Sequence, residues 1–201
     1  ECLVAAGGAV YLNMGTLLPV YRETLPRTAA AAFKSGKPWV LDPVGIGIGQ
    51  LRSDLLLELK QYKPAIVRGN ASEIIALASL WGIEANACES SRPRGVDTTD
   101  TVEAARDAAA ALARYTGGAV AVSGKKDLVT DGEKVAYSEG GSELMEKVTG
   151  SGCPQGGVLA VYATATNPFT AALAAVAHYN VAGYRAAKVA DAPASFKTAF
   201  I

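Results

Sequence analysis

The chain has 201 residues, of which 50% are hydrophobic and 19% are charged. This composition is typical of a globular protein and excludes a disordered chain, and the length suffices for one domain with a sizeable core. Basic and acidic residues balance at 19 each, so no net positive charge is available to attract a nucleic-acid backbone. No apolar run reaches the length of a membrane span before a glycine or a charge interrupts it.

The cysteines argue against a disulfide framework and against a zinc site. Cys2, Cys88 and Cys153 lie far apart, no CxxC pair occurs, and His178 is the one histidine. A reducing cytoplasm is therefore the expected location. The chain starts at Glu1 and enters an apolar, strand-like run at once, so we expect that its true start is missing.

Short apolar runs alternate with helical patterns along the first part of the chain. The predicted elements are a strand over 9–13, a helix over 19–35, a strand over 38–44, a helix over 53–61 capped by Ser53, a strand over 65–70, and a helix from Ser72 to Leu80.

The remaining elements begin after a polar, breaker-rich loop over 82–100. They are a helix over 101–116 capped by Thr99 or Asp100, strands over 118–124, 127–132 and 134–138 with a hairpin at 131–132, and helices over 153–166 and 169–189. This order predicts a single α/β domain over 1–201, with a mostly parallel sheet, helices on both faces and an antiparallel edge.

In a parallel sheet of this kind, ligands bind beyond the carboxyl ends of the strands. This rule selects five segments for closer attention: 13–16, 42–49, 68–73, 123–126 and 149–153. The loop over 45–51 lacks the spacing of a dinucleotide-binding loop and is interpreted as flexible or substrate-lining. No P-loop lysine motif is present.

The segment TGSGCP, residues 149–154, has the features of an anion cradle. Backbone N–H groups at a helix start have no partner within the helix, and the helix dipole adds partial positive charge there. Glycines let an anion approach the backbone closely, and Pro154 suits the first helical position. The alternative is a glycine-rich turn beside a small buried cysteine, Cys153.

Acidic and amide side chains follow two of the predicted strands. Asp42 ends one strand, and Asn70 and Glu73 follow the next. Their oxygens suit Mg²⁺, which proteins hold through few carboxylates together with water and substrate phosphates. The alternative is that Ser72 caps a helix whose first turn favours Glu73.

Two further strand ends carry polar groups. Arg68 ends an apolar strand and could face a phosphate or form an ion pair with Asp42 or Glu73. Ser123 could bond a phosphate or belong to a simple turn. His178 lies among alanines and valines of a long helix and is interpreted as a packed or partner-facing side chain.

Seven segments in this order resemble hydroxyethylthiazole kinase, a ribokinase-like family of thiamine salvage, over nearly the whole chain. They are NMGTL (13–17), LDPVGIG (41–47), VRGNASEI (67–74), GVDTTD (95–100), AVSGKKDLVTDG (121–132), KVTGSGC (147–153) and SFKTAF (195–200). The block RGNASE and the cysteine of the loop are the more selective features.

The resemblance implies a ribokinase-like three-layer fold and transfer of the γ-phosphate of ATP to the hydroxyethyl group of 4-methyl-5-(2-hydroxyethyl)thiazole. It implies a homotrimer with the thiazole pocket between subunits, and Mg²⁺ as the cation. By the family pattern, Asp42 and Glu73 lie around Mg²⁺ and the phosphates. Gly150 and Gly152 belong to the anion hole, beside Cys153 at the position of the base.

The resemblance also implies two sets of binding residues. Arg68, Ser123, Asn70 and Glu73 correspond to positions around the nucleotide, where threonine is commoner than serine at position 123. Gly150, together with Asn13 and Gly15 of the NMGTL segment, corresponds to the substrate side.

The chain departs from the family pattern in three places. The opening strand and helix, with a methionine that contacts thiazole, are expected to be missing, as are the last few residues of the family. Pro154 removes one backbone donor near the cradle. Two other hypotheses therefore stay open: a kinase of another small alcohol such as hydroxymethylpyrimidine, and a nucleotide- or vitamin-binding regulator without turnover.

Overall fold

The computed structural model describes residues 2–83 and 102–200 and contains one six-stranded sheet. Its strands are β1 (Val10–Asn13), β2 (Trp39–Asp42), β3 (Ile66–Asn70), β4 (Ala119–Ser123), β5 (Lys126–Thr130) and β6 (Val135–Glu139). The strands lie side by side in chain order. β1 to β4 are parallel, while β5 and β6 are antiparallel to their neighbours, so the expected antiparallel edge is confirmed.

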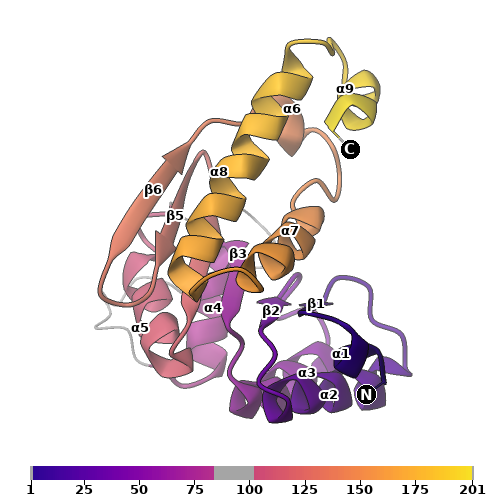
Figure 1. Ribbon diagram of the computed structural model, residues 1–201, viewed down its shortest axis with the longest axis vertical. Helices are drawn as coiled ribbons and strands as arrows, with labels where there is room; N and C mark the ends of the chain where they lie inside the picture. Colours follow the sequence, from indigo (N-terminus) through magenta and orange to yellow (C-terminus); the bar gives the residue numbers. More distant parts are fainter. Residues whose placement is uncertain (1, 84–101, 201) are drawn as a thin grey trace.

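Helices cover both faces of this sheet (Figure 1). The helical elements are α1 (Cys2–Ala6), α2 (Tyr21–Lys34), α3 (Gln50–Leu59), the 3₁₀ turn η1 (Lys60–Tyr62), α4 (Ala71–Leu80), α5 (Arg106–Thr116), α6 (Glu143–Glu146), α7 (Cys153–Ala163), α8 (Pro168–Ala187) and α9 (Pro193–Phe200). Within the described ranges, none of them combines the length and apolarity that a bilayer crossing requires.

Successive side chains of the parallel strands point to opposite faces of the sheet and so belong to two separate hydrophobic cores. In β2, Leu41 belongs to the core shared with α2 to α5, whereas Val40 belongs to the core under α7 and α8. β3 repeats the pattern with Val67 and Ile66. Because successive side chains of a strand point to opposite faces, a strand covered on both sides must be apolar at every position, and β2 is buried throughout.

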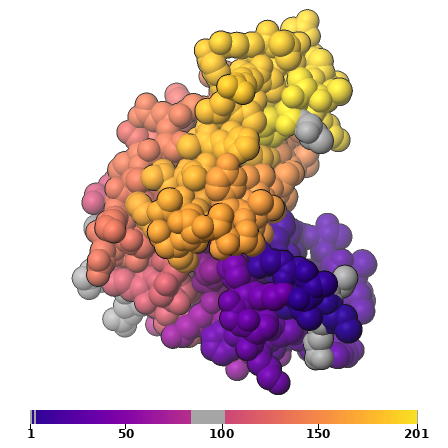
Figure 2. Space-filling view, viewed as in Figure 1, coloured from indigo at the N-terminus to yellow at the C-terminus, as the bar shows by residue number. Residues whose placement is uncertain are grey.

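The C-terminal end of α8 extends beyond the sheet and forms a small third core with α6 and α9. Its buried members are Ala186, Ala190 and Phe196, and Met145 and Phe200 pack against them. Figure 2 shows this part projecting at one end of the molecule, in yellow. The turn that precedes α7 therefore connects the small core to the sheet.

The main elements expected from the sequence are confirmed, but two helix starts are wrong. α3 begins at Gln50 after Gly49, so Ser53 lies inside the helix and does not cap it. α4 begins at Ala71, and its cap is Asn70 rather than Ser72. Both errors have one cause: the helical pattern of apolar residues starts later than the helix itself.

Other differences concern the ends of the chain and the helix expected over 101–116. That helix begins at Arg106, and its expected caps at Thr99 and Asp100 lie outside the described residues. The opening residues form the helix α1 instead of a strand-like run, with the Lys37 ammonium donating to the carbonyls of Val4, Ala5 and Gly7. The short helices α6 and α9 were not predicted.

Two adjacent glycines in α7 offer a matched test of packing between this helix and β1. A Cβ on Gly156 would lie 2.1 Å from Cε2 of Tyr11, whereas a Cβ on Gly157 would meet nothing within 4 Å. We expect Gly156→Ala to lower the free energy of unfolding by about 1–3 kcal/mol, because it forces the Tyr11 ring out of place. Gly157→Ala should be neutral or stabilising by up to about 1 kcal/mol, as alanine favours helices.

Urea unfolding of the two variants at one pH measures both effects. Equal changes in the two variants would show that Tyr11 does not pack against Gly156 in solution.

Candidate active site

Polar side chains from four neighbouring strands meet at the carboxyl edge of the parallel sheet. Asn13 lies opposite Asp42 in the register of β1 and β2, and Asn70 lies opposite Ser123 in that of β3 and β4. The first residue of α7, Cys153, joins them through its carbonyl oxygen, which is 2.7 Å from the hydroxyl of Tyr11. The structure therefore brings together side chains that the sequence places far apart.

Asp42 is the centre of this edge and is fully buried. Its Oδ2 accepts a hydrogen bond from Nδ2 of Asn13 at 3.2 Å and lies 2.9 Å from the hydroxyl of Tyr11, whose one proton is shared between this oxygen and the carbonyl of Cys153. Nη1 of Arg68 lies 3.3 Å from the same oxygen. Its Oδ1 has no hydrogen-bond partner, and it is the one such buried side-chain atom in the described residues. A buried carboxylate oxygen without a donor is costly, so this atom is a candidate ligand for a bound group.

Burial raises the pKa of Asp42 to about 6. The positive charge of Arg68 opposes this rise, and the negative charge of Glu73 adds to it. Removing a carboxylate from water disfavours its charged form, and one ion pair does not offset that cost fully here. The protonation state of Asp42 therefore depends on the charged groups near it, Arg68 and Glu73.

Arg68 forms an ion pair with Asp42, which is one of the partners that the sequence suggested, and two further side chains hold its guanidinium. It is 8% exposed and pairs with Asp42. Its Nε donates to Oε1 of Gln155 at 3.0 Å, and its Nη2 donates to Oγ of Ser123 at 3.1 Å. A Cβ on Gly152 would lie 2.6 Å from Nη2, so only glycine leaves room for the guanidinium under the turn.

Asn70 and Glu73 form a complete capping box at the start of α4. The amide of Glu73 donates to Oδ1 of Asn70, and the amide of Asn70 donates to Oε2 of Glu73, both at 2.9 Å. The other oxygen of Glu73 lies 3.4 Å from the amide of Gly45. A side chain therefore caps this helix and Glu73 lies in its first turn, as the alternative interpretation predicted, but the capping residue is Asn70 and not Ser72.

The donor set fits Mg²⁺ only in a form that is not enclosed by protein. Among the described residues, no group of three or more Asp, Glu, His or Cys side chains could hold a metal. Mg²⁺ is often held by one or two carboxylates plus water and substrate phosphates, which needs no such group. The unpartnered Oδ1 of Asp42 fits this mode. Glu73 fits it less well, because backbone amides occupy both of its oxygens.

The turn before α7 has fewer open amides than the sequence suggested. The amide of Ser151 donates to the carbonyl of Val148 at 3.0 Å, and the amide of Cys153 donates to that of Gly150 at 3.2 Å. Within the part of the chain that the structure describes, the amides of Gly150 and Gly152 have no acceptor. In the cradle expected over 149–154, the amides of Ser151 and Cys153 are therefore already bound, and those of Gly150 and Gly152 are left.

The surroundings of Gly150 are open, whereas Gly152 lies against the guanidinium of Arg68. Gly150 has φ +81°, a conformation that favours glycine, and a Cβ there would meet nothing within 4 Å. Cys153 is half-buried and carries a free thiol. Pro154 is the second residue of α7 rather than the first, and it contributes no N–H group. An anion can thus approach the turn from the side of Gly150.

Asn13 and Gly15 form a tight turn after β1. Oδ1 of Asn13 accepts from the amide of Gly15 at 2.8 Å, and Nδ2 of Asn13 donates to the Tyr11 hydroxyl at 2.7 Å. Arg52 fixes the same segment, because it donates to the carbonyls of Met14, Gly15 and Ile48. The loop over 45–51, interpreted from the sequence as flexible or substrate-lining, is thereby tied to the end of β1.

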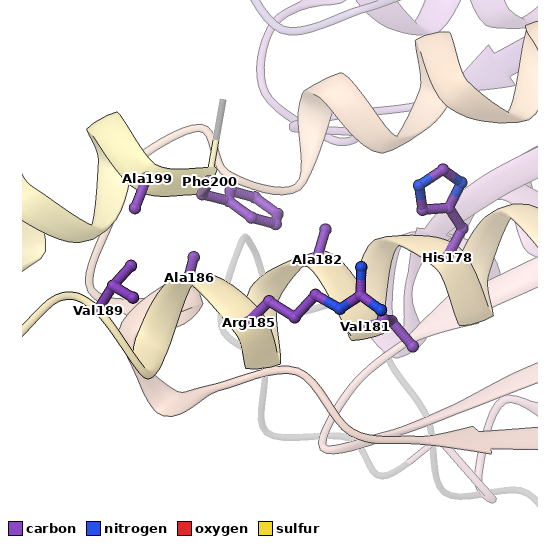
Figure 3. Close-up of a pocket in the computed structure, with 8 residues that line it drawn as sticks. All are labelled: His178, Val181, Ala182, Arg185, Ala186, Val189, Ala199 and Phe200. Atoms are coloured by element: carbon purple, nitrogen blue, oxygen red, sulfur yellow. The ribbon is translucent and has the colours of Figure 1, made fainter.

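His178 lies away from this edge, as its interpretation as a non-catalytic residue requires. It is exposed on α8, and its Nδ1 is 2.7 Å from the hydroxyl of Tyr162. Figure 3 shows it at one end of a groove between α8 and α9. The groove is lined by His178, Val181, Ala182, Arg185, Ala186, Val189, Ala199 and Phe200. None of the residues predicted for the site belongs to it.

Sequence reasoning missed three side chains that organise the site: Tyr11, Gln155 and Tyr179. Tyr11 joins Asp42 to the turn, Gln155 holds Arg68, and the Tyr179 hydroxyl donates to the carbonyl of Ser151. Alternation in β1 could have shown that Tyr11 and Asn13 share a face of the sheet. No local pattern indicates that a tyrosine of α8 reaches the turn.

The raised pKa of Asp42 has a measurable consequence for stability. The folded protein holds the Asp42 proton more tightly than the unfolded chain, so this carboxyl's contribution to the free energy of unfolding falls as pH rises. We expect the difference in that free energy between the wild type and Asp42→Asn to fall by roughly 2 kcal/mol between about pH 4 and pH 7. Urea unfolding in EDTA across this range measures it.

Asp131 supplies a control of opposite sign. Backbone amides of Lys134 and Glu133 lower the pKa of this exposed carboxyl, so the matching difference for Asp131→Asn should rise with pH. A difference for Asp42→Asn that is flat or rising over the same range would contradict the buried, raised-pKa state.

Comparison with known proteins places this geometry in a family. The model of the hydroxyethylthiazole kinase family matches residues 1–201. Hydroxyethylthiazole kinase of Bifidobacterium longum (strain DJO10A) is 46% identical over 211 residues, covering 96% of this chain and 67% of that protein. Hydroxyethylthiazole kinase of Cereibacter sphaeroides is 42% identical over 197 residues, covering 98% of this chain and 72% of that protein.

Solved structures agree on the fold. A hydroxyethylthiazole kinase protein from Pyrococcus horikoshii OT3 superposes with a TM-score of 0.84 at 30% identity, covering 98% of this chain and 71% of the other. Pyridoxal kinase from Staphylococcus aureus, in complex with ADP, superposes with a TM-score of 0.64 at 18% identity, which shows a shared fold alone. The expected ribokinase-like architecture is confirmed, and the chain belongs to the hydroxyethylthiazole kinase family.

Proposed function

We propose that this chain transfers the γ-phosphoryl group of ATP to the hydroxyl of 4-methyl-5-(2-hydroxyethyl)thiazole. One observation carries the proposal beyond family membership: the open amides of Gly150 and Gly152 lie in the turn that leads to Cys153, whose carbonyl shares the Tyr11 hydroxyl with Asp42. Phosphoryl transfer needs positioning and charge stabilisation more than covalent chemistry from the protein, and this arrangement would supply both.

The turn before α7 would act on the transferred group and on the alcohol. The amides of Gly150 and Gly152 would donate to the oxygens of the phosphoryl group, where charge develops. The thiol of Cys153 would orient the alcohol or accept its proton. Of these two roles for the thiol, orientation needs no basic thiolate.

Asp42 would be the main protein ligand of Mg²⁺, with Glu73 near it. The cation, when bound, neutralises charge on the phosphates. Oδ1 of Asp42, which lacks a donor, is the oxygen free to bind it. Arg68 holds the other oxygen of the same carboxylate and so fixes its orientation.

Arg68, Ser123 and Asn70 would contact the nucleotide at the ends of β3 and β4. Their mutual hydrogen bonds support this role, because a guanidinium already held by Asp42, Gln155 and Ser123 keeps one orientation when a phosphate arrives. Asn13 and Gly15 would line the thiazole side. We place the reaction in the cytoplasm and expect a homotrimer with a shared thiazole pocket, which sedimentation velocity would test.

Substitution of Cys153 tests the proposed chemistry. With ATP, Mg²⁺ and hydroxyethylthiazole, the protein should form phosphorylated thiazole, and Cys153→Ala should lower kcat at least about tenfold, as expected for a lost general base or orienting group. KM for ATP should change little, because the thiol is proposed to contact the alcohol and not the nucleotide. The kcat of Cys153→Ser should lie between that of the wild type and that of Cys153→Ala if the side chain at position 153 orients the alcohol.

A panel with hydroxymethylpyrimidine in place of the thiazole distinguishes the remaining possibilities. Faster phosphorylation of the pyrimidine would replace the proposed substrate and keep the kinase. Nucleotide binding without transfer to either alcohol would indicate a silent binding protein and overturn the proposal.

A further inference from the structure

The turn before α7 is held by residues on either side of each open amide. The amide of Cys153 is bound to Gly150, and its carbonyl is bound by Tyr11. Ser151 is bound at all three of its polar groups, while the amides of Gly150 and Gly152 point to no acceptor in the described residues. Fixed and free groups thus alternate along four residues, which ordinary helix capping does not require.

Ser151 is the best-anchored residue of the turn. Its amide donates to the carbonyl of Val148 at 3.0 Å, and its hydroxyl donates to the carbonyl of Met145 at 2.5 Å. Its own carbonyl accepts from the hydroxyl of Tyr179 on α8. The first two bonds are local, whereas the third ties the turn to another helix of the molecule.

The carbonyl of Ser151 and the amide of Gly152 belong to one peptide unit. This unit is planar and trans, so its C=O and N–H groups point in opposite directions. A hydroxyl that holds the carbonyl on the side of α8 must therefore direct the Gly152 N–H away from α8. The orientation of one open donor depends on a side chain 28 residues away along the chain.

We propose that Tyr179 is a positioning residue that aims the Gly152 amide at the transferred phosphoryl group. The inference rests on the proposed function, because it supplies the reason why this amide is kept free. Tyr179 does not touch the substrate in this scheme and acts through the Ser151–Gly152 peptide unit.

The Tyr179 ring is held independently of its hydroxyl. The side chain is 7% exposed, and its ring packs against that of Phe200 with centroids 4.8 Å apart. Phenylalanine at this position keeps the ring contact and removes the one hydrogen bond to the turn. Tyr179→Phe is therefore a clean probe of the hydroxyl.

Tyr162 provides the matched control. Its hydroxyl also makes a single hydrogen bond between two helices, to Nδ1 of His178 on α8, but it lies outside the site. Tyr162→Phe thus removes the same group from the same part of the fold without touching the turn.

Steady-state kinetics separate positioning from simple stabilisation. We expect Tyr179→Phe to lower kcat about three- to tenfold, the size of one lost hydrogen bond, with KM for ATP and for the thiazole nearly unchanged. Tyr162→Phe should leave both constants as in the wild type. Unchanged kcat in a folded Tyr179→Phe protein, or a loss that appears equally in Tyr162→Phe, would overturn the proposal.

Orthophosphate binding tests the same idea without turnover. In protein labelled with ¹⁵N at glycine, orthophosphate should shift the Gly152 amide resonance downfield in the wild type and in Tyr162→Phe, with a smaller shift and weaker binding, by roughly threefold, in Tyr179→Phe. If the wild type shows this shift and Tyr179→Phe the smaller one, but no thiazole is phosphorylated, the proposed function fails and Tyr179 still orients an amide that binds phosphate. Absence of any Gly152 shift in the wild type overturns the role of Tyr179 even if the kinase is active.

Discussion

The buried contact between Asp42 and Arg68 is the interaction on which the rest of the site depends. Both side chains are nearly inaccessible to water, so each would be strongly unfavourable without the other. Attraction to Arg68 does not fully offset the cost of burying Asp42, since the pKa of that carboxyl stays raised. Burial of the pair is therefore not fully compensated in the folded protein, and the partnerless Oδ1 of Asp42 adds to that cost.

The ion pair also determines which residues can surround it. The guanidinium of Arg68 needs glycine at position 152, and the ring of Tyr11, whose hydroxyl reaches Asp42, needs glycine at position 156. These two glycines thus serve the close approach of side chains from β3 and β1, whereas Gly150 serves a backbone conformation. One glycine-rich stretch meets three separate physical requirements.

The strand-end residues could be predicted from the sequence because one rule connects local pattern to position. Parallel strands end at the same edge, so Asn13, Asp42 and Ser123 are brought together once the strands are recognised. Helix starts were less predictable, because Asn70 caps α4 before its apolar pattern begins. The hydrogen bonds of Tyr11 and Tyr179 to the turn could not be predicted from the sequence. The carbonyls that they bind lie 142 and 28 residues away, and local spacing carries no information about such contacts.

The two tyrosines explain how a glycine-rich turn can present fixed donors. A short run of glycines has many accessible conformations, and ordering it costs conformational entropy. Hydrogen bonds from β1 and α8 to the carbonyls of Cys153 and Ser151 remove that freedom before any ligand arrives. If the turn holds the transferred phosphoryl group as proposed, donors fixed in advance would need no reorganisation during the reaction.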